Sequence, residues 1–121
     1  MAIFRYLVMD VETSIEFYKR HLGFELVEKM GQAFAIIKKD DLSIWLSGPQ
    51  TSAARVIPDG RVPEPGGWNR FVIEVVDIEK LVAAMKAAGN TFRNEIVSGP
   101  GGKQILVEDP SGNPIEIFQS S

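Results

Sequence analysis

The chain contains the same pattern twice, and this repetition constrains the fold more than any other feature of the sequence. Residues 3–10 alternate as a strand does and end at Asp10, a residue type that favours a helix N-cap. Residues 70–77 alternate in the same way and end at Asp77. Three residue pairs show one common separation along the chain, namely Ile3 and Arg70, Val8 and Val75, and Asp10 and Asp77. This shared interval indicates an internal duplication.

A helix and three short strands are predicted after each of these first strands. Residues 11–23 and 78–89 place apolar side chains on one helical face and end in glycine, which favours a helix C-terminus. Runs typical of strands, separated by turn-forming residues, follow at 24–30, 33–39 and 42–48 in the first half and at 91–97, 103–109 and 114–119 in the second. Each half is therefore predicted to be β-α-β-β-β, which makes the fold class α+β with two tandem modules.

A long segment rich in proline and glycine joins the two halves. We expect residues 1–121 to form one domain, with module one at 1–48, a connecting loop at 49–68 and module two at 69–121. A loop of this length is uncommon inside a compact domain. Two interpretations stay open: the loop is a functional segment that covers a binding site, or it is a plain linker.

Composition and charge exclude several classes of partner. The formal net charge is −3, so the chain lacks the basic surface that nucleic-acid binding requires. No apolar run has the length needed to cross a membrane, and the strand-like N-terminus leaves no room for a secretory signal. The absence of cysteine excludes disulfides and thiolate metal sites. We expect a cytoplasmic protein with no nucleic-acid or membrane partner.

Two segments carry a resemblance to a known family. These segments are FYKRHLGF at 17–24 and DPSGNPIE at 109–116, set in paired βαβββ modules. In this setting they resemble the vicinal oxygen chelate superfamily, which includes glyoxalase I, extradiol dioxygenases and bleomycin-resistance proteins. The resemblance implies a cleft-shaped, partly open mixed β-sheet barrel with the helices outside. It also implies a small-molecule ligand in the cleft between the modules and a homodimer. These segments are specific to the fold and much less so to an activity.

The resemblance also bears on metal binding. Metal-binding members of the superfamily use four strand positions, which correspond here to Ile3, Trp45, Arg70 and Glu116. Those members have His, Gln or Glu at the first three positions, whereas one carboxylate alone does not hold a divalent ion. The single histidine, His21, is interpreted as a solvated residue near a helix C-terminus. We therefore expect no metal ion and no cofactor.

Strand alternation predicts which side chains line the cleft. In residues 3–8 the odd positions face the cleft, while Phe4, Tyr6 and Val8 face the helix. Together with the resemblance, this pattern gives seven expected ligand-binding residues: Arg5, Trp45, Ser47, Arg70, Gln104, Glu116 and Phe118. Lys103, beside the glycine-rich segment 98–102, is expected as a solvated residue at the cleft rim.

Three of the cleft residues are candidates for chemistry. Glu116, Arg70 and Glu74 are the candidate catalytic residues, with a carboxylate as base and the guanidinium as stabiliser of an oxyanion. We expect Arg70 to pair with Glu116, so that the guanidinium partly replaces the missing cation. Two interpretations of the pair stay open, because it either meets a ligand or only holds the two modules in register. Trp45 likewise either forms a wall for a ligand or fills the former metal position.

The sequence favours one function over its alternatives. The first hypothesis is a metal-independent small-molecule binding protein of the glyoxalase/bleomycin-resistance type, with a partly aromatic or anionic ligand in the inter-module cleft. The alternative is a lyase, isomerase or dioxygenase-like enzyme of the same superfamily, metal-free and with Glu116 or Glu74 as base. The lost ligand positions speak against a metal-dependent glyoxalase. Whether any reaction is catalysed stays open at this point.

Overall fold

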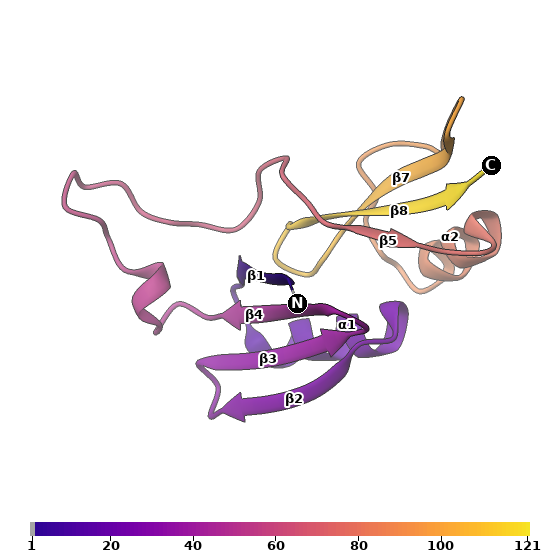
Figure 1. Ribbon diagram of the computed structural model, residues 1–121. Helices are drawn as coiled ribbons and strands as arrows, with labels where there is room; N and C mark the ends of the chain where they lie inside the picture. The colour runs from indigo at the N-terminus through magenta and orange to yellow at the C-terminus, as the bar shows by residue number, and fades with distance from the viewer. Residues whose placement is uncertain (1) are drawn as a thin grey trace. The chain divides into compact units, whose positions relative to one another are not determined.

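A computed structural model describes residues 2–121 and divides the chain into two compact units, Met1–Gly66 and Gly67–Ser121. Each unit contains one α-helix and one four-stranded mixed sheet, so the fold is α+β (Figure 1). The predicted β-α-β-β-β order is present in both units. Over the described residues, neither helix is both long and apolar enough to cross a membrane.

The two units share one topology. The first contains β1 (Ala2–Leu7), α1 (Val11–Leu22), β2 (Glu25–Met30), β3 (Phe34–Lys39) and β4 (Leu42–Ser47), followed by the 3-10 helix η1 (Ser52–Ala54). The second contains β5 (Val72–Glu74), α2 (Ile78–Ala87), β6 (Val97–Gly99), β7 (Gly102–Glu108) and β8 (Pro114–Ser120). The strand orders are β1-β4-β3-β2 and β5-β8-β7-β6, and in each sheet only the first pair is parallel. Equal topology is what a duplication predicts.

Aspartate N-caps begin both helices. The Asp10 side chain accepts a 3.1 Å hydrogen bond from the backbone N–H of Glu12, and the Asp77 side chain accepts one of 3.1 Å from that of Lys80. Such a cap typically contributes about 1 kcal/mol of helix stability. At the C-terminal end of α1, Gly23 has a φ of 73°, in the left-handed region that glycine tolerates. The predicted helix starts and the predicted end of α1 are confirmed. They could be predicted because each depends on the side chain or backbone of a residue at the helix end itself.

The core of each unit lies between its helix and one face of its sheet. Fully buried side chains in the first unit include Tyr18, Ile37, Ile44 and Leu46, and those in the second include Ile78, Met85, Ile105 and Ile117. Tyr6 and Val8 of β1 are buried, as their alternation predicts. Phe4 was expected on the same face but is 36% exposed. It lies on an edge strand, where only β4 covers one side.

The expected strand at 91–97 is mostly wrong. Only Phe92 forms an isolated bridge there, with Val107 of β7, and β6 begins later, at Val97. The Asn94 side chain explains the break, because its Oδ1 accepts the 2.9 Å hydrogen bond that Leu106 N–H would otherwise give to a backbone carbonyl. β5 is also shorter than expected, with three residues. Between β4 and β5 the only regular element in the described chain is η1.

His21 is less exposed than the sequence suggested. Its ring lies against that of Phe17 on α1, with 5.5 Å between the centroids, and the residue is partly buried. The helix therefore covers one side of an imidazole that was expected to be solvated.

Lowering the pH from about 7 to about 5 is expected to reduce the unfolding free energy in part through His21. Burial, and then the charge of Arg20, lower the pKa of His21 below its ordinary value of 6.5, while Glu16 opposes them. The folded state therefore binds fewer protons, so the contribution is present above pH 6.5 and is lost as the pH falls through the folded pKa. His21→Gln should flatten the dependence of melting temperature on pH, and an unchanged slope would contradict this assignment.

Candidate functional site

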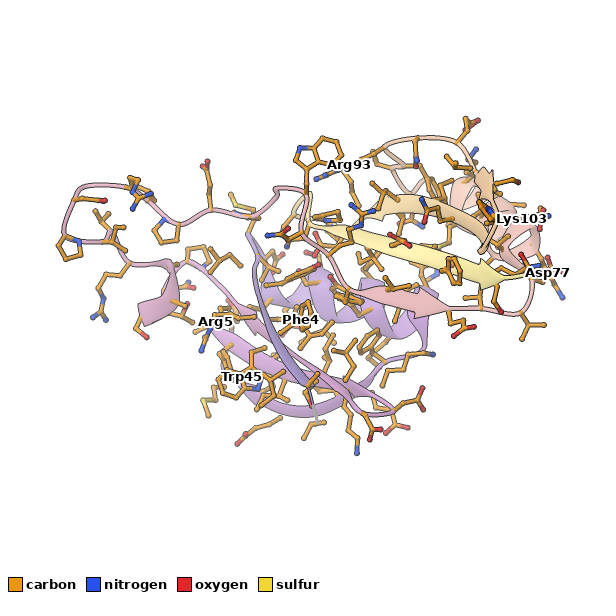
Figure 2. All side chains as sticks on the ribbon, turned by 45° about the horizontal axis from the view of Figure 1, so that its top comes forward. Phe4, Arg5, Trp45, Asp77, Arg93 and Lys103 are labelled. Atoms are coloured by element: carbon orange, nitrogen blue, oxygen red, sulfur yellow. The ribbon has the colours of Figure 1, made fainter. Side chains whose placement is uncertain are left out.

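Arg5 and Trp45 lie side by side on one face of the first sheet (Figure 2), and Ser47 lies on the same face. The parallel pairing of β1 and β4 sets Arg5 opposite Trp45, and alternation along β4 puts Ser47 on the same face. The guanidinium carbon of Arg5 lies 5.0 Å from the centroid of the Trp45 ring. One terminal nitrogen, Nη1, donates a 3.0 Å hydrogen bond to Ser47 Oγ. The indole and the hydroxyl together fix the orientation of this cation.

Apolar side chains surround this group. Phe34 contacts Trp45 edge to face, with 6.0 Å between ring centroids, and Ile36 is the register partner of Trp45 in β3. Ile3, two residues before Arg5 on the same face, is exposed. Sequence reasoning missed Phe34 and Ile36, although the alternation in residues 33–39 carries the signal. No carboxylate of the described residues lies within ion-pairing distance of Arg5.

Arg70 and Glu116 form an ion pair in the second unit. Arg70 donates to Glu116 Oε1 from Nε at 3.1 Å and from Nη2 at 2.8 Å, while Nη1 donates to the carbonyl oxygen of Trp68 at 3.2 Å. The side chains are 31% and 12% exposed, respectively. The predicted partner is therefore the correct one. Both hydrogen bonds from Arg70 end on the same carboxylate oxygen, Oε1 of Glu116.

Gln104, Phe118 and Glu74 follow one another across the second sheet. Phe118 of β8 is opposite Gln104 of β7 and Glu74 of β5. Gln104 and Phe118 line a hollow of about 240 Å³ with Val97 and the turn at 99–102. Glu74 is exposed, and no ion pair involves it among the residues that the structure describes. This hollow therefore contains two of the expected ligand-binding residues, Gln104 and Phe118.

Lys103 does not share the face of Gln104. Its Nζ lies 2.6 Å from Glu79 Oε1 at the start of α2, on the helix side of β7 (Figure 2). The hydrogen bond from Lys103 lowers the pKa of Glu79. Lys103 therefore points away from the face of Gln104, because adjacent residues of a strand point to opposite faces. Its side chain is 40% exposed, so the expected solvation is observed, although the expected place on the face of Gln104 is not.

The four positions that correspond to metal ligands do not fit a metal ion. Ile3 and Trp45, in the first unit, offer no oxygen or imidazole donor. Arg70 is a permanent cation, and it occupies one oxygen of Glu116. Within residues 2–121 no group of three or more His, Asp or Glu side chains has the geometry to hold an ion. The donor set therefore gives no basis for a metal-dependent step.

Removing either member of the Arg70–Glu116 pair is expected to lower the unfolding free energy by about 1–2 kcal/mol, since the pair is only partly buried. The double variant Arg70→Met/Glu116→Leu should lose less than the sum of Arg70→Met and Glu116→Leu, because neither charge is then left unpaired. Urea unfolding of the four proteins measures the coupling directly. Strictly additive losses would contradict a stabilising pair.

The chain is similar to one known protein family and to two curated proteins. The model of the Glyoxalase/Bleomycin resistance protein/Dioxygenase superfamily matches residues 2–117. The chain is 30% identical over 122 residues to lactoylglutathione lyase GLX1 of Arabidopsis thaliana. This match covers 94% of this chain and 42% of that protein. It is 28% identical over 123 residues to a probable chloroplastic lactoylglutathione lyase of the same plant, covering 94% and 34%. The chain thus spans less than half the length of these curated relatives.

Solved structures share the fold over nearly the whole chain. A lactoylglutathione lyase from Agrobacterium tumefaciens has a TM-score of 0.74 at 19% identity, covering 98% of this chain and 92% of that one. TnmS3, an antibiotic binding protein from Streptomyces sp. CB03234, has a TM-score of 0.73 at 24% identity, covering 98% and 93%. A glyoxalase-related enzyme from Fulvimarina pelagi has a TM-score of 0.76 at 20% identity, covering 99% and 87%. At these identities the likeness extends to the fold alone.

Proposed function

Since the chain belongs to the glyoxalase/bleomycin resistance protein/dioxygenase superfamily, we propose that it is a small-molecule binding protein that works without a metal ion. The observation that carries this proposal is the Arg70–Glu116 pair, in which a cation takes the place of a metal ligand and neutralises the remaining carboxylate. A site arranged in this way has no open coordination position to offer.

The proposed ligand is partly aromatic or anionic. The exposed face of the first sheet supports this class, because Arg5 provides a positive charge beside the indole of Trp45. The hollow lined by Gln104 and Phe118 offers an amide and an aromatic ring in the second unit. A few polar groups set among apolar side chains are typical of small-molecule sites.

An enzyme is the second candidate, and the curated relatives favour it, because both are named lactoylglutathione lyases. In a metal-free reaction, Glu116 or Glu74 would take up a proton and Arg70 would stabilise an oxyanion. Glu116 Oε2 accepts no hydrogen bond from the described residues, so one oxygen of this carboxylate is available to a substrate.

A thermal melt of the tag-free protein tests the metal-free proposal. Ni²⁺, Mn²⁺, Zn²⁺ and Fe²⁺, each with a chelator control, are expected to leave the melting temperature unchanged, because only a ligand of the folded state raises it. Aromatic and anionic small molecules in the same assay should raise it. A strong shift by one metal that Glu116→Ala abolishes would contradict the proposal. Lactoylglutathione formation from methylglyoxal and glutathione, followed in parallel, would favour the enzyme.

We also propose that the protein forms a homodimer in the cytoplasm. Exposed apolar side chains on the sheets support association, and these are Ile3, Phe4, Val72 and Val97. Light scattering during size-exclusion chromatography should give twice the mass of the 121-residue chain. A monomer mass at micromolar concentration would contradict the dimer.

A further inference from the structure

We propose that the ligand is a planar aromatic carboxylate and that Arg5 of the first sheet, rather than Arg70 of the second, recognises its anionic group. This inference rests on the proposed binding function and narrows the class of ligand. It follows from the different surroundings of the two arginines, since one is paired with a carboxylate and the other is not.

Arg70 has little left to offer an anion. Its Nε and Nη2 donate to Glu116, and its Nη1 donates to the Trp68 carbonyl. An approaching carboxylate would also meet the negative charge of Glu116. For these reasons Arg70 does not serve as the anion receptor.

Arg5 has the opposite character. A guanidinium carries five N–H donors, and a single hydrogen bond to Ser47 Oγ uses one of them. The residue is exposed, and no acidic side chain in the described part of the chain neutralises it. The remaining donors suit a carboxylate, which accepts two parallel N–H bonds from a planar guanidinium.

The surroundings hold this cation before any ligand arrives. Ser47 is fully buried, so its hydroxyl is a fixed acceptor for Nη1 of Arg5. The Trp45 ring lies against the guanidinium and is itself contacted at its edge by Phe34. Ordering a free arginine side chain on binding would oppose association, and this arrangement reduces that loss.

The shape of the ligand follows from the apolar neighbours. Phe34 and Ile36 flank Trp45 on the face that carries Arg5, and Ile3 is exposed beside it. A ring attached to the carboxylate would cover these side chains while the anion meets Arg5. An aliphatic or phosphate anion would use the charge alone and leave the apolar surface in water.

Calorimetric titration with 2-naphthoate tests the inference on the full chain. Wild-type protein should bind 2-naphthoate at least tenfold more tightly than the neutral isostere 2-naphthamide. Arg5→Met should weaken 2-naphthoate at least tenfold and leave 2-naphthamide unchanged. Arg20→Met is the matched control, because Arg20 is exposed on α1, which covers the other face of the sheet. This control should bind as the wild type does.

The outcomes separate the inference from the function on which it rests. Equal affinities for 2-naphthoate and 2-naphthamide, or full affinity in Arg5→Met, would overturn the role of Arg5 and leave a binding protein. Displacement of 2-naphthoate by inorganic phosphate but not by benzoate would overturn the planar carboxylate. If Arg5→Met does not fold, the naphthoate and naphthamide affinities of the wild type decide. If titration with 2-naphthoate gives no binding signal, the inference about the ligand is overturned. The melting-temperature screen then decides separately whether the protein binds small molecules at all.

Discussion

Arg93→Ala is expected to lower the unfolding free energy by about 3 kcal/mol, through the loss of a partly buried ion pair and the hydrogen bonds around it. Arg93 Nε donates to Glu108 Oε2 at 2.8 Å, Nη2 donates to the Gly112 carbonyl at 3.0 Å, and Nη1 donates to the Gly67 carbonyl. The guanidinium carbon lies 4.5 Å from the Trp68 ring centroid. One side chain thus connects the segment before β5, the strand β7 and the β7–β8 turn.

Burial makes this effect large. The Arg93 side chain, paired with a glutamate, is 15% exposed, whereas that of Arg61, which pairs with an aspartate at 2.9 Å, is 80% exposed. Arg61→Ala is therefore the matched control, and its unfolding free energy should stay within about 0.5 kcal/mol of the wild type. Urea unfolding followed by circular dichroism measures both. Equal losses in the two variants would show that burial does not set the energy of these pairs.

Asp109→Ala is the second substitution with a large expected effect, about 3 kcal/mol. Asp109 is buried in the turn before β8. Its Oδ1 accepts from the N–H groups of Ser111 at 2.8 Å and Asn113 at 2.9 Å, and its Oδ2 accepts from Asn113 Nδ2 at 3.0 Å. Alanine leaves three donors without this acceptor, and each unsatisfied buried group is destabilising by about 1 kcal/mol or more.

Two further variants test the cause of this loss. Asp109→Asn keeps one oxygen but turns an amide toward the amide of Asn113, so we expect it to lose about half as much. Asp59→Ala is the surface control, because Asp59 accepts from Arg61 N–H in an exposed turn. Thermal melts of all three should give the order Asp109→Ala, Asp109→Asn and Asp59→Ala, from lowest to highest melting temperature. A surface control as unstable as Asp109→Ala would contradict the argument.

The fold was predictable wherever its signals are local. Asp10 and Asp77 fix the helix starts through their own side chains, and Gly23 ends α1 through its backbone freedom. Alternation likewise placed Tyr6 and Val8 in the core. The predicted strand at 91–97 is not formed because the Asn94 side chain, in place of a backbone carbonyl of that segment, accepts the hydrogen bond from Leu106 N–H of β7. No local sequence pattern indicates this contact.

The candidate site was predictable only in part. The Arg70–Glu116 pair came from a family resemblance, since its partners lie far apart in the sequence. Arg70 has a carboxylate partner and Arg5 has none because of the register between neighbouring strands. The spacing of residues along the sequence does not give this register. The contacts of Arg93 could not be predicted from the sequence, because its partners Gly67, Glu108 and Gly112 lie far from it along the chain. Tertiary contacts of this kind are fixed by the fold and not by neighbouring residues.

The order of strands in each sheet also bears on solubility. β2 and β6 are edge strands, and both resist intermolecular pairing: β2 carries three charged residues among six, and β6 has only three residues and precedes Pro100. β1, at the opposite edge of its sheet, is longer than β6 and carries one charge, with Ile3 exposed. Aggregation at high concentration should therefore begin at β1, and a lysine in place of Ile3 would suppress it.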